Sequence, residues 1–332
     1  MFAEVFGLCG VAEGDTCAVL SETQTRPELP QLAELALLRL GARVFHLVLP
    51  ARPLAAPVPV RSTGASDAIG GLVPVVQALA GCRFIADCTV EGLMHARELP
   101  QILASGARGL YISHEHPETL ERCLPRAEDE APVREAMRRL KAAREMHVTS
   151  EAGTDLRIAL AGARVGGVWG FTSRPGSWSH WPGGLVLAFP AAGSVNGTLV
   201  LDRGDVNLTF KRYLADPVTL VIENDHAVRV AGESLDAETM RGYFAAWGDA
   251  SAYAVSHVGW GLNRRARWDA MQFLDKADCN GTELRAFAGN FLYSTGANEV
   301  AGRHTLGHFD LPLRGCTVRL DGVTVVDRGQ LV

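Results

Sequence analysis

The sequence has none of the features that mark membrane or secreted proteins. No stretch reaches the ~18 uninterrupted apolar residues that a membrane span needs, and the N-terminal segment lacks the basic start and apolar run of a signal peptide. The seven cysteines are an odd number and include no Cys-x-x-Cys pair, so we expect buried, reduced thiols. These absences predict a cytoplasmic protein with no membrane partner.

An excess of positive charge and a phosphate-binding turn are also missing. With 32 Lys and Arg against 37 Asp and Glu, the net charge is −5, and the basic residues are scattered, which argues against a nucleic-acid partner. No GxGxxG, GxxxxGKS or GxxxxGKT motif is present, so a nucleotide cofactor is disfavoured. The hydrophobic share of 47% and charged share of 21% are those of a globular protein, and the 332 residues suit two domains better than one.

Up to about residue 145 the sequence alternates short apolar runs with helical stretches, beginning with TCAVLSET, LPQLAELALLRLG and ARVFHLVLP. The leucines of the middle segment are expected to cover one broad helix face, and Gly41 is expected to end that helix. Apolar strands separated by helices are typical of a parallel sheet that is covered on both faces. Residues 1–147 are therefore predicted to form a doubly wound α/β domain.

From about Val148 the pattern changes to glycine-punctuated alternating runs such as TDLRIALAGARVGGVWG and VTLVIENDHAVRVAGE, which indicate hairpins of an antiparallel sheet. One helix is predicted in SLDAETMRGYFAAWGD, with Ser234 and Glu238 near its start. Residues 148–332 are therefore predicted to form a β-rich α+β domain. No long linker separates the two halves, so we expect them to pack closely.

A candidate metal site lies in the second half. In the segment GHFDLP, His308 and Asp310 are two positions apart, and in an extended chain such residues point to the same face. His257, flanked by Gly259 and Gly261, is a candidate third ligand, because small neighbours let a ligand approach the backbone. Two histidines and one carboxylate hold ferrous iron and leave three adjacent positions open. The spacing alone leaves a second interpretation open, a surface histidine beside a carboxylate.

The sequence resembles a known family, the 2,5-dihydroxypyridine 5,6-dioxygenases of bacterial nicotinate and hydroxypicolinate breakdown, which are similar in fold to the M29 thermophilic aminopeptidases. The resemblance covers most of the chain and is carried by SEAGTDLRIAL (150–160), SHVGWGLNRRARWDA (256–270), FAGNFLYSTGANEVAGR (287–303) and GHFDLP (307–312). It implies that His257, His308 and Asp310 bind Fe(2+). It further implies a homo-oligomer that uses dioxygen to open 2,5-dihydroxypyridine, a small aromatic N-heterocycle, between C5 and C6, giving N-formylmaleamate.

The resemblance also implies that His95, in EGLMHARELP, and His180, in GSWSHWPGG, transfer protons. An imidazole titrates near neutral pH, so it can take a proton from the substrate hydroxyl and return one later. Residue type alone leaves structural roles open, a polar helix residue for His95 and a histidine packed between tryptophans for His180. Which of the two acts as the base and which as the acid is also left open.

Two further residues are expected to meet the substrate. Ser294, in YSTG, could hydrogen-bond the ring nitrogen, a substrate oxygen or bound oxygen, whereas Thr295 is expected to be a turn residue, with Gly296 making room for the turn. Trp260, beside His257, is expected to line the pocket by stacking on an aromatic ring. The alternative for Trp260 is a core residue, which is the commoner fate of a buried tryptophan.

Two other polar clusters are expected to have structural roles. His114 and His116, in SHEHPE, could be a second pair of metal ligands, but no converging partner is evident, and a helix cap or a surface loop explains them as well. Glu151 and Asp155, in SEAGTDL, suit a bend between strands.

Two other functions remain open. The first is an M29-like metal-dependent aminopeptidase, which needs several carboxylates around two metal ions; Glu223 is the only obvious extra candidate. The second is a non-catalytic binding protein, in which the His-x-Asp pair would be incidental. The metal content of the protein separates the three possibilities: about one iron per chain, two metal ions, or none.

Overall fold

The structure, a computed structural model, describes residues 1–60 and 66–332. Its first half forms a parallel sheet in the order β2-β1-β3-β4-β8, in which every neighbouring pair runs parallel. The predicted α/β character of this half is confirmed. The strands are β1 (Thr16–Glu22), β2 (Arg43–Leu49), β3 (Phe84–Asp87), β4 (Arg108–Ile112) and β8 (Trp178–Trp181).

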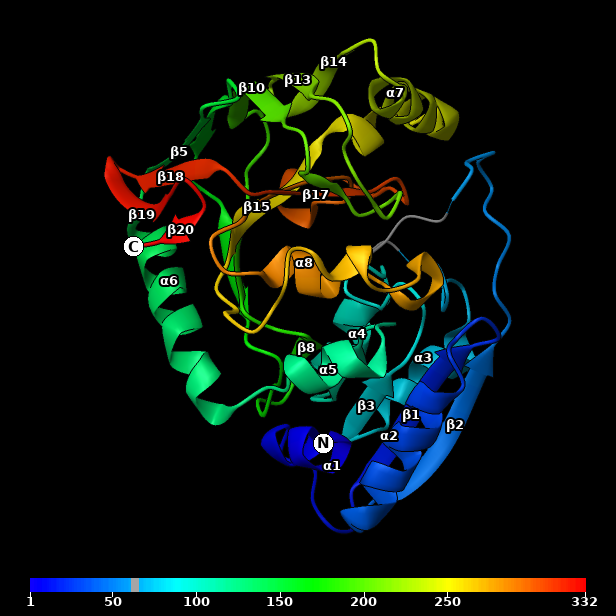
Figure 1. The fold of residues 1–332 in the computed structure, drawn as a ribbon. Coiled ribbons are helices and arrows are strands. Elements are labelled where there is room, and N and C mark those ends of the chain that lie inside the picture. The colour runs from blue at the N-terminus through cyan, green and yellow to red at the C-terminus, as the bar shows by residue number, and fades with distance from the viewer. Residues whose placement is uncertain (61–65) are drawn as a thin grey trace.

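Helices cover both faces of this sheet (Figure 1). Successive side chains of a strand point to opposite faces, so Cys17 and Val19 of β1 pack with α1 and α2, while Ala18 and Leu20 pack with α3 and α4. The sheet is therefore doubly wound, as predicted. The helices are α1 (Phe2–Leu8), α2 (Glu28–Arg39), α3 (Val73–Ala80), α4 (Leu99–Ala104) and α5 (Pro117–Arg122).

Helix α2 departs from its prediction in one respect. Leu29 and Leu37 are fully buried, but Leu35 and Leu38 are 63% and 52% exposed, so the leucines do not share one buried face. Gly41 follows the helix with φ +78°, a left-handed conformation that glycine adopts without strain. Its amide donates to Leu38 O, so Gly41 ends the helix as expected.

The second half is mainly antiparallel. An eight-stranded sheet runs in the order β14-β13-β10-β6-β5-β18-β19-β20, and a five-stranded sheet runs β17-β16-β15-β9-β7. The strands of the larger sheet are β5 (Glu145–Ser150), β6 (Asp155–Ala159), β10 (Val195–Leu201), β13 (Val218–Glu223), β14 (His226–Ala231), β18 (Cys316–Leu320), β19 (Val323–Asp327) and β20 (Gln330–Leu331). Those of the smaller sheet are β7 (Arg164–Val168), β9 (Leu185–Phe189), β15 (Val255–Gly261), β16 (Phe291–Thr295) and β17 (Phe309–Leu313).

Short elements complete this half. A two-stranded ribbon pairs β11 (Val206–Asn207) with β12 (Arg212–Tyr213). The α-helices are α6 (Glu130–Ala142), α7 (Leu235–Trp247) and α8 (Thr282–Ala286), and the 3-10 helices are η1 (Ala127–Asp129), η2 (Ala250–Tyr253), η3 (Ala270–Gln272), η4 (Lys276–Asp278) and η5 (Glu299–Ala301). Helix α7 begins as predicted, because the Ser234 hydroxyl accepts the Ala237 N–H.

The change from parallel to antiparallel pairing falls at β5, which spans the predicted boundary between residues 147 and 148. Strand β8 is an exception, because it comes later in the chain but pairs in parallel with β4. The second half thus supplies the fifth strand of the first sheet. The division into two domains at 147/148 stays a prediction.

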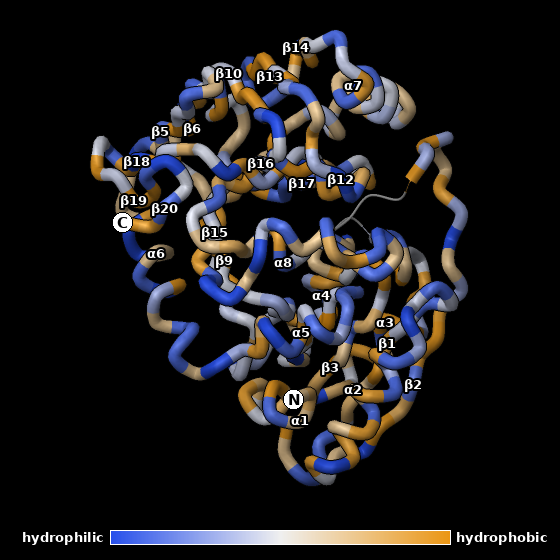
Figure 2. Tube along the Cα trace, viewed as in Figure 1, coloured by the Kyte–Doolittle hydropathy of each residue, from blue (hydrophilic) through white to orange (hydrophobic). Residues whose placement is uncertain are grey.

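One large apolar core joins the two antiparallel sheets, and two smaller cores flank the parallel sheet. Figure 2 shows apolar residues along the strands and polar residues on many of the outer turns. All seven cysteines are buried and free, as expected. Within residues 1–60 and 66–332, no helix is both long enough and apolar enough to cross a membrane.

Candidate metal centre

Three side chains of the smaller antiparallel sheet converge on one point. His257 lies on β15, Asp310 lies on β17, and His308 immediately precedes β17. Strand β16 lies between β15 and β17, and its Ser294 is opposite both His257 and Asp310. The ligand atoms of the two histidines and the aspartate all lie within 4.8 Å of one another. The predicted triad is therefore assembled in space.

The His257 ring is held in one orientation. Its Nδ1 lies 3.0 Å from Ser256 Oγ, and the Ser256 hydroxyl donates its single hydrogen to Ala297 O. Ser256 Oγ can then only accept, so Nδ1 must carry the hydrogen and Nε2 keeps its lone pair. Burial lowers the pKa of His257 to about 3, which keeps the ring neutral near pH 7. Nε2, at 3.6 Å from Asp310 Oδ1, is thus ready to bind a metal.

Replacing Ser256 with Ala should weaken metal binding. The substitution removes the acceptor of the His257 Nδ1 hydrogen, and loss of such outer partners costs roughly 10–100-fold in metal affinity. Competition with a chelator of known affinity measures the change. Ser21→Ala, at another buried serine on β1, is the matched control and should leave affinity unchanged. Equal affinity in Ser256→Ala and the wild type would show that the hydrogen bond does not support the ligand.

Asp310 is held from two sides. Ser294 Oγ donates to Oδ1, and Arg285 Nε donates to Oδ2. Burial alone would raise the pKa of Asp310, but the Arg285 guanidinium and the neighbouring histidines hold this pKa well below its usual value. The carboxylate is therefore ionised near neutral pH, the form that binds a cation.

His308 completes the triad. Its Nε2 lies 3.3 Å from Asp310 Oδ2, and its backbone carbonyl accepts from the Thr209 hydroxyl. Gly296 lies against the ring with φ +117°, and a Cβ at this position would lie 3.1 Å from His308 Nδ1 and 2.4 Å from Gly307 O. Gly296 was expected to make room for the turn. In the structure it also leaves room for the His308 ring. Two imidazoles and one carboxylate are a donor set that fits a divalent metal ion.

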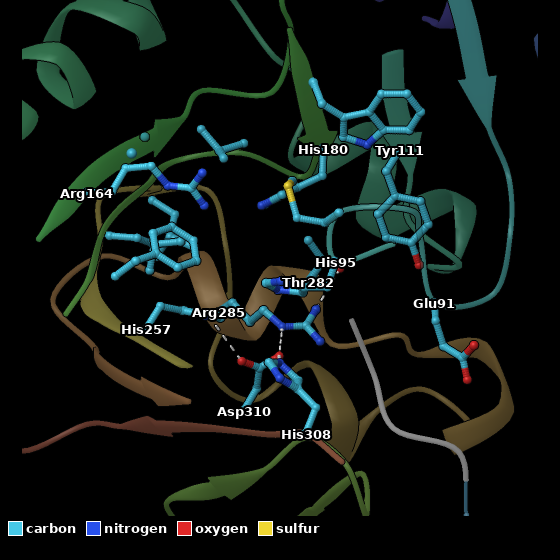
Figure 3. A pocket seen from close by; sticks show the side chains of 18 of the residues that line it. Glu91, His95, Tyr111, Arg164, His180, His257, Thr282, Arg285, His308 and Asp310 are labelled. Carbon is cyan, nitrogen blue, oxygen red and sulfur yellow. Dashed lines mark hydrogen bonds and ion pairs between the residues drawn. The ribbon is translucent and has the colours of Figure 1, made fainter. Parts of the chain in front are cut away.

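A cavity of about 260 Å³ opens over the triad. Figure 3 shows Asp310 lying among Arg285, His257 and His308, with His95 and His180 in the same pocket. One part of the wall is apolar and the other carries polar groups. The lining residues are Glu91, Met94, His95, Tyr111, Arg164, Val165, Gly166, Gly167, Val168, Trp178, His180, Leu185, Leu187, Phe189, His257, Asn280, Thr282, Arg285, His308 and Asp310.

The two histidines expected to transfer protons both reach this pocket. The His95 ring lies 5.8 Å from the His257 ring and 5.4 Å from the His308 ring, between centroids. Burial lowers the pKa of His95 well below its usual value, and the two neighbouring histidines lower it further. His180 reaches the pocket from β8, the strand that returns to the parallel sheet.

The tautomer of His180 follows from its contacts. Its Nδ1 lies 2.6 Å from Pro182 O, and a carbonyl oxygen can only accept, so Nδ1 carries the hydrogen. Burial lowers the pKa of His180 to about 4, so the ring is neutral near pH 7. Nε2 then has a free lone pair and can accept a proton from a molecule in the pocket.

Ser294 and Trp260 lie outside the lining of this pocket. The Ser294 hydroxyl donates to Asp310, so in this structure it supports a candidate metal ligand, and direct contact with substrate stays a prediction. Trp260 is 2% exposed and belongs to the large core. It lies three positions from His257, so it points to the opposite face of β15. The expectation that it lines the pocket is therefore corrected to the alternative, a core residue.

Several pocket residues were not identified in the sequence. Arg285, Tyr111 and Asn280 line the cavity, but each is an isolated polar residue in its own segment, without a spacing that marks it. The Asn280 amide donates to Tyr111 Oη and to Val90 O. This network joins the two halves of the chain at the cavity.

The SHEHPE segment is structural, as the second interpretation held. His116 is the N-cap of α5, where its Nδ1 accepts the Glu118 N–H, and His114 Nε2 accepts the Arg26 N–H at 2.7 Å. Glu115, between them, is 1% exposed and accepts the backbone N–H groups of residues 280–283. The carboxylate thus accepts the first backbone N–H groups of α8 from the other half of the chain.

His114 gives a pH-dependent contribution to stability. Burial lowers the pKa of His114 to about 4, whereas an unfolded histidine titrates near 6.5. Between these values only the unfolded chain binds this proton, so the contribution is complete above about pH 6.5 and decreases as pH falls toward 4. The destabilisation caused by His114→Gln should shrink by about 1–2 kcal/mol between pH 7.5 and pH 5. Urea unfolding of both metal-free proteins measures it; a pH-independent difference would contradict the account.

Known proteins resemble this chain along its whole length. A family model described as 2,5-dihydroxypyridine 5,6-dioxygenase matches residues 1–332. A 2,5-dihydroxypyridine 5,6-dioxygenase of Pseudomonas putida strain KT2440 is 38% identical, with 100% of this chain and 95% of the relative covered. A solved structure of the 2,5-dihydroxypyridine dioxygenase from Pseudomonas putida KT2440 superposes with a TM-score of 0.94 at 37% identity, covering 100% of this chain and 95% of that one.

A more distant likeness shows the fold alone. Wild-type AmpT from Thermus thermophilus superposes with a TM-score of 0.59 at 15% identity, covering 100% of this chain and 98% of that one. The whole-chain family match and the 38% identity go further. The chain belongs to the 2,5-dihydroxypyridine 5,6-dioxygenase family.

Proposed function

We propose that this protein binds one iron(II) ion through His257, His308 and Asp310 and uses dioxygen to open 2,5-dihydroxypyridine to N-formylmaleamate. The observation that carries the proposal is the buried cluster of two imidazoles and one carboxylate at one wall of a cavity, in a chain of this family. This donor set is the one that non-haem iron(II) oxygenases use. The reaction adds both atoms of O2 to the substrate and releases no fragment.

Iron held by His257, His308 and Asp310 would supply a site that brings the substrate hydroxyl and dioxygen together. The chain's own residues do the rest. His180 accepts the hydroxyl proton at Nε2, because its Nδ1 is committed to Pro182 O. The protonated His180 can then return this proton as the ring opens, and His95, which faces both candidate histidine ligands, is the second group that can carry it. Leu185, Leu187 and the other apolar wall residues pack against the ring and exclude water.

One metal ion fits this site better than the two of an aminopeptidase. Within residues 1–60 and 66–332, the cluster of potential ligands is limited to the triad, and a two-metal hydrolase needs further carboxylates at ~3.5–4 Å metal spacing. Glu223, the extra carboxylate considered from the sequence, lies at the exposed end of β13, and Arg285, a cation, holds Asp310 instead. The family match also favours the dioxygenase over the aminopeptidase.

The proposal is tested by reconstituting the full chain anaerobically with ferrous iron and adding 2,5-dihydroxypyridine in air. We expect one iron per chain, loss of the pyridine absorbance, equimolar O2 uptake and, with labelled oxygen, both atoms in the product by mass spectrometry. The zinc-loaded protein is the control and should be inactive. Turnover with zinc alone, or peptide cleavage in place of ring opening, would overturn the assignment. A homo-oligomer in the cytoplasm remains part of the proposal, testable by light scattering and cell fractionation.

A further inference from the structure

A buried cation is bound directly to the carboxylate ligand. Arg285 Nε lies 2.5 Å from Asp310 Oδ2, and the two side chains are 10% and 2% exposed. The Ser294 hydroxyl donates a hydrogen bond to the other carboxylate oxygen, Oδ1. Each oxygen of the ligand is therefore hydrogen-bonded by the protein, one of them to a full positive charge.

The guanidinium is fixed in this place by a second set of contacts. Its Nη1 donates to Thr282 Oγ1 at 3.0 Å and to Asn280 Oδ1 at 3.2 Å. The turn that carries these two residues is held by the buried Glu115 carboxylate, which accepts the backbone N–H groups of residues 280–283. The arginine therefore stays beside Asp310, anchored ultimately from the parallel-sheet half of the chain.

The position of this positive charge affects the redox equilibrium of a metal ion that has two oxidation states. A positive charge in a buried site repels a trivalent ion more strongly than a divalent one, and little water is present to screen it. By sharing an Asp310 lone pair, Arg285 also reduces the electron donation of the carboxylate to the metal, an outer-contact effect that tunes redox potential. Both effects act in the same direction, toward the lower oxidation state.

We propose that Arg285 is a positioning residue that acts through Asp310 to hold the bound iron in the ferrous state, the state that reacts with dioxygen. The inference rests on the proposed iron site but does not depend on the identity of the substrate. Arg285 would thus protect the resting enzyme from oxidation by the O2 that it uses.

Three variants separate charge from packing. Arg285→Gln removes the charge, and Arg285→Lys keeps it. Arg108→Gln is the control. Arg108 is also a buried arginine, with 5% of its surface exposed, but it lies at the start of β4, outside the pocket lining. Its guanidinium donates to Gly10 O and Ser173 O. Each full-length variant is loaded anaerobically with ferrous iron, and its ferric/ferrous midpoint potential is measured by mediated titration, with the high-spin ferric EPR signal as the readout.

Arg285→Gln is expected to favour ferric over ferrous iron at least about tenfold more than the wild type, which lowers the potential by about 59 mV for a one-electron couple. Arg285→Lys and Arg108→Gln should stay within about threefold of the wild type, since the site keeps its charge in both. A potential in Arg285→Gln equal to or above that of the wild type would overturn the inference.

Two further outcomes keep the test decisive. If Arg285→Gln fails to retain ferrous iron, Arg285→Met serves as a second neutral variant, and loss of iron from both overturns the inference, because removing a repulsive charge should leave the ion bound. The potential is measured without turnover. A wild-type protein that holds iron but does not open 2,5-dihydroxypyridine therefore refutes the proposed substrate only, whereas one that binds no iron refutes both proposals.

Discussion

His308→Ala should lose the metal and all measurable turnover while the chain stays folded. Loss of an outer partner of a ligand already costs 10–100-fold in affinity, so loss of the ligand itself should weaken iron binding by more than about a hundredfold. The residue precedes β17, an edge strand of the smaller antiparallel sheet, and the backbone pairing of β17 with β16 does not use the imidazole. Iron content by mass spectrometry, oxygen uptake and circular dichroism measure the three properties.

The matched control is His46→Ala, because His46 lies on β2 at the edge of the parallel sheet, with its side chain 32% exposed. It should retain one iron per chain and full activity. A His308→Ala protein that still held one iron per chain would remove His308 from the ligand set. If His308→Ala does not fold, His257→Ala and Asp310→Asn, at the other two proposed ligands, test the same iron site.

His180→Gln should retain iron but turn over roughly 10²–10⁴-fold more slowly, the usual contribution of a general base. Its Nε2 is the group that accepts the substrate proton in this account, because Nδ1 donates to Pro182 O. A glutamine amide can hydrogen-bond substrate but cannot take the proton. The measurements are kcat with saturating substrate, the iron content, and substrate binding under anaerobic conditions.

Raising the pH should partly restore this variant, since the substrate hydroxyl then ionises without a base. Wild-type activity should show no such gain. Trp178→Phe, on the same strand and also lining the pocket, is the control for a change of shape without loss of a base. Full activity in His180→Gln would exclude it as the base and leave His95 in that role.

The ligand triad could be predicted from the sequence because two of its members lie on one extended segment. Positions i and i+2 share a face of a strand, and Asp310 and His308 do so next to β17. The third member, His257, was a candidate because of its flanking glycines and the resemblance, and it converges with the other two in the structure. Its role as a metal ligand stays a prediction. The reason given for its flanking glycines was incomplete, however: a Cβ at Gly259 would lie 1.9 Å from Val186 O, and one at Gly261 would lie 2.1 Å from Phe287 O. These glycines make room for neighbouring backbone.

The rest of the site depends on long-range packing that the sequence does not display. Arg285 reaches Asp310 across 25 positions, and Glu115 caps α8 from more than 160 positions away. No local pattern predicts such pairs. The place of strand β8 could not be predicted either, because its pairing with β4 in the parallel sheet depends on tertiary contacts and not on a local sequence pattern. Trp260, by contrast, could have been assigned to the core, since strand alternation places it opposite His257.

The most direct test of the account is a crystal structure of the anaerobic iron-loaded protein, with data collected on both sides of the iron absorption edge. We predict one anomalous peak per chain, about 2.0–2.2 Å from one nitrogen of His257, one nitrogen of His308 and an oxygen of Asp310, as ligand bonds to such ions require. A peak elsewhere, two peaks per chain, or a His257 ring turned away from the ion would contradict it.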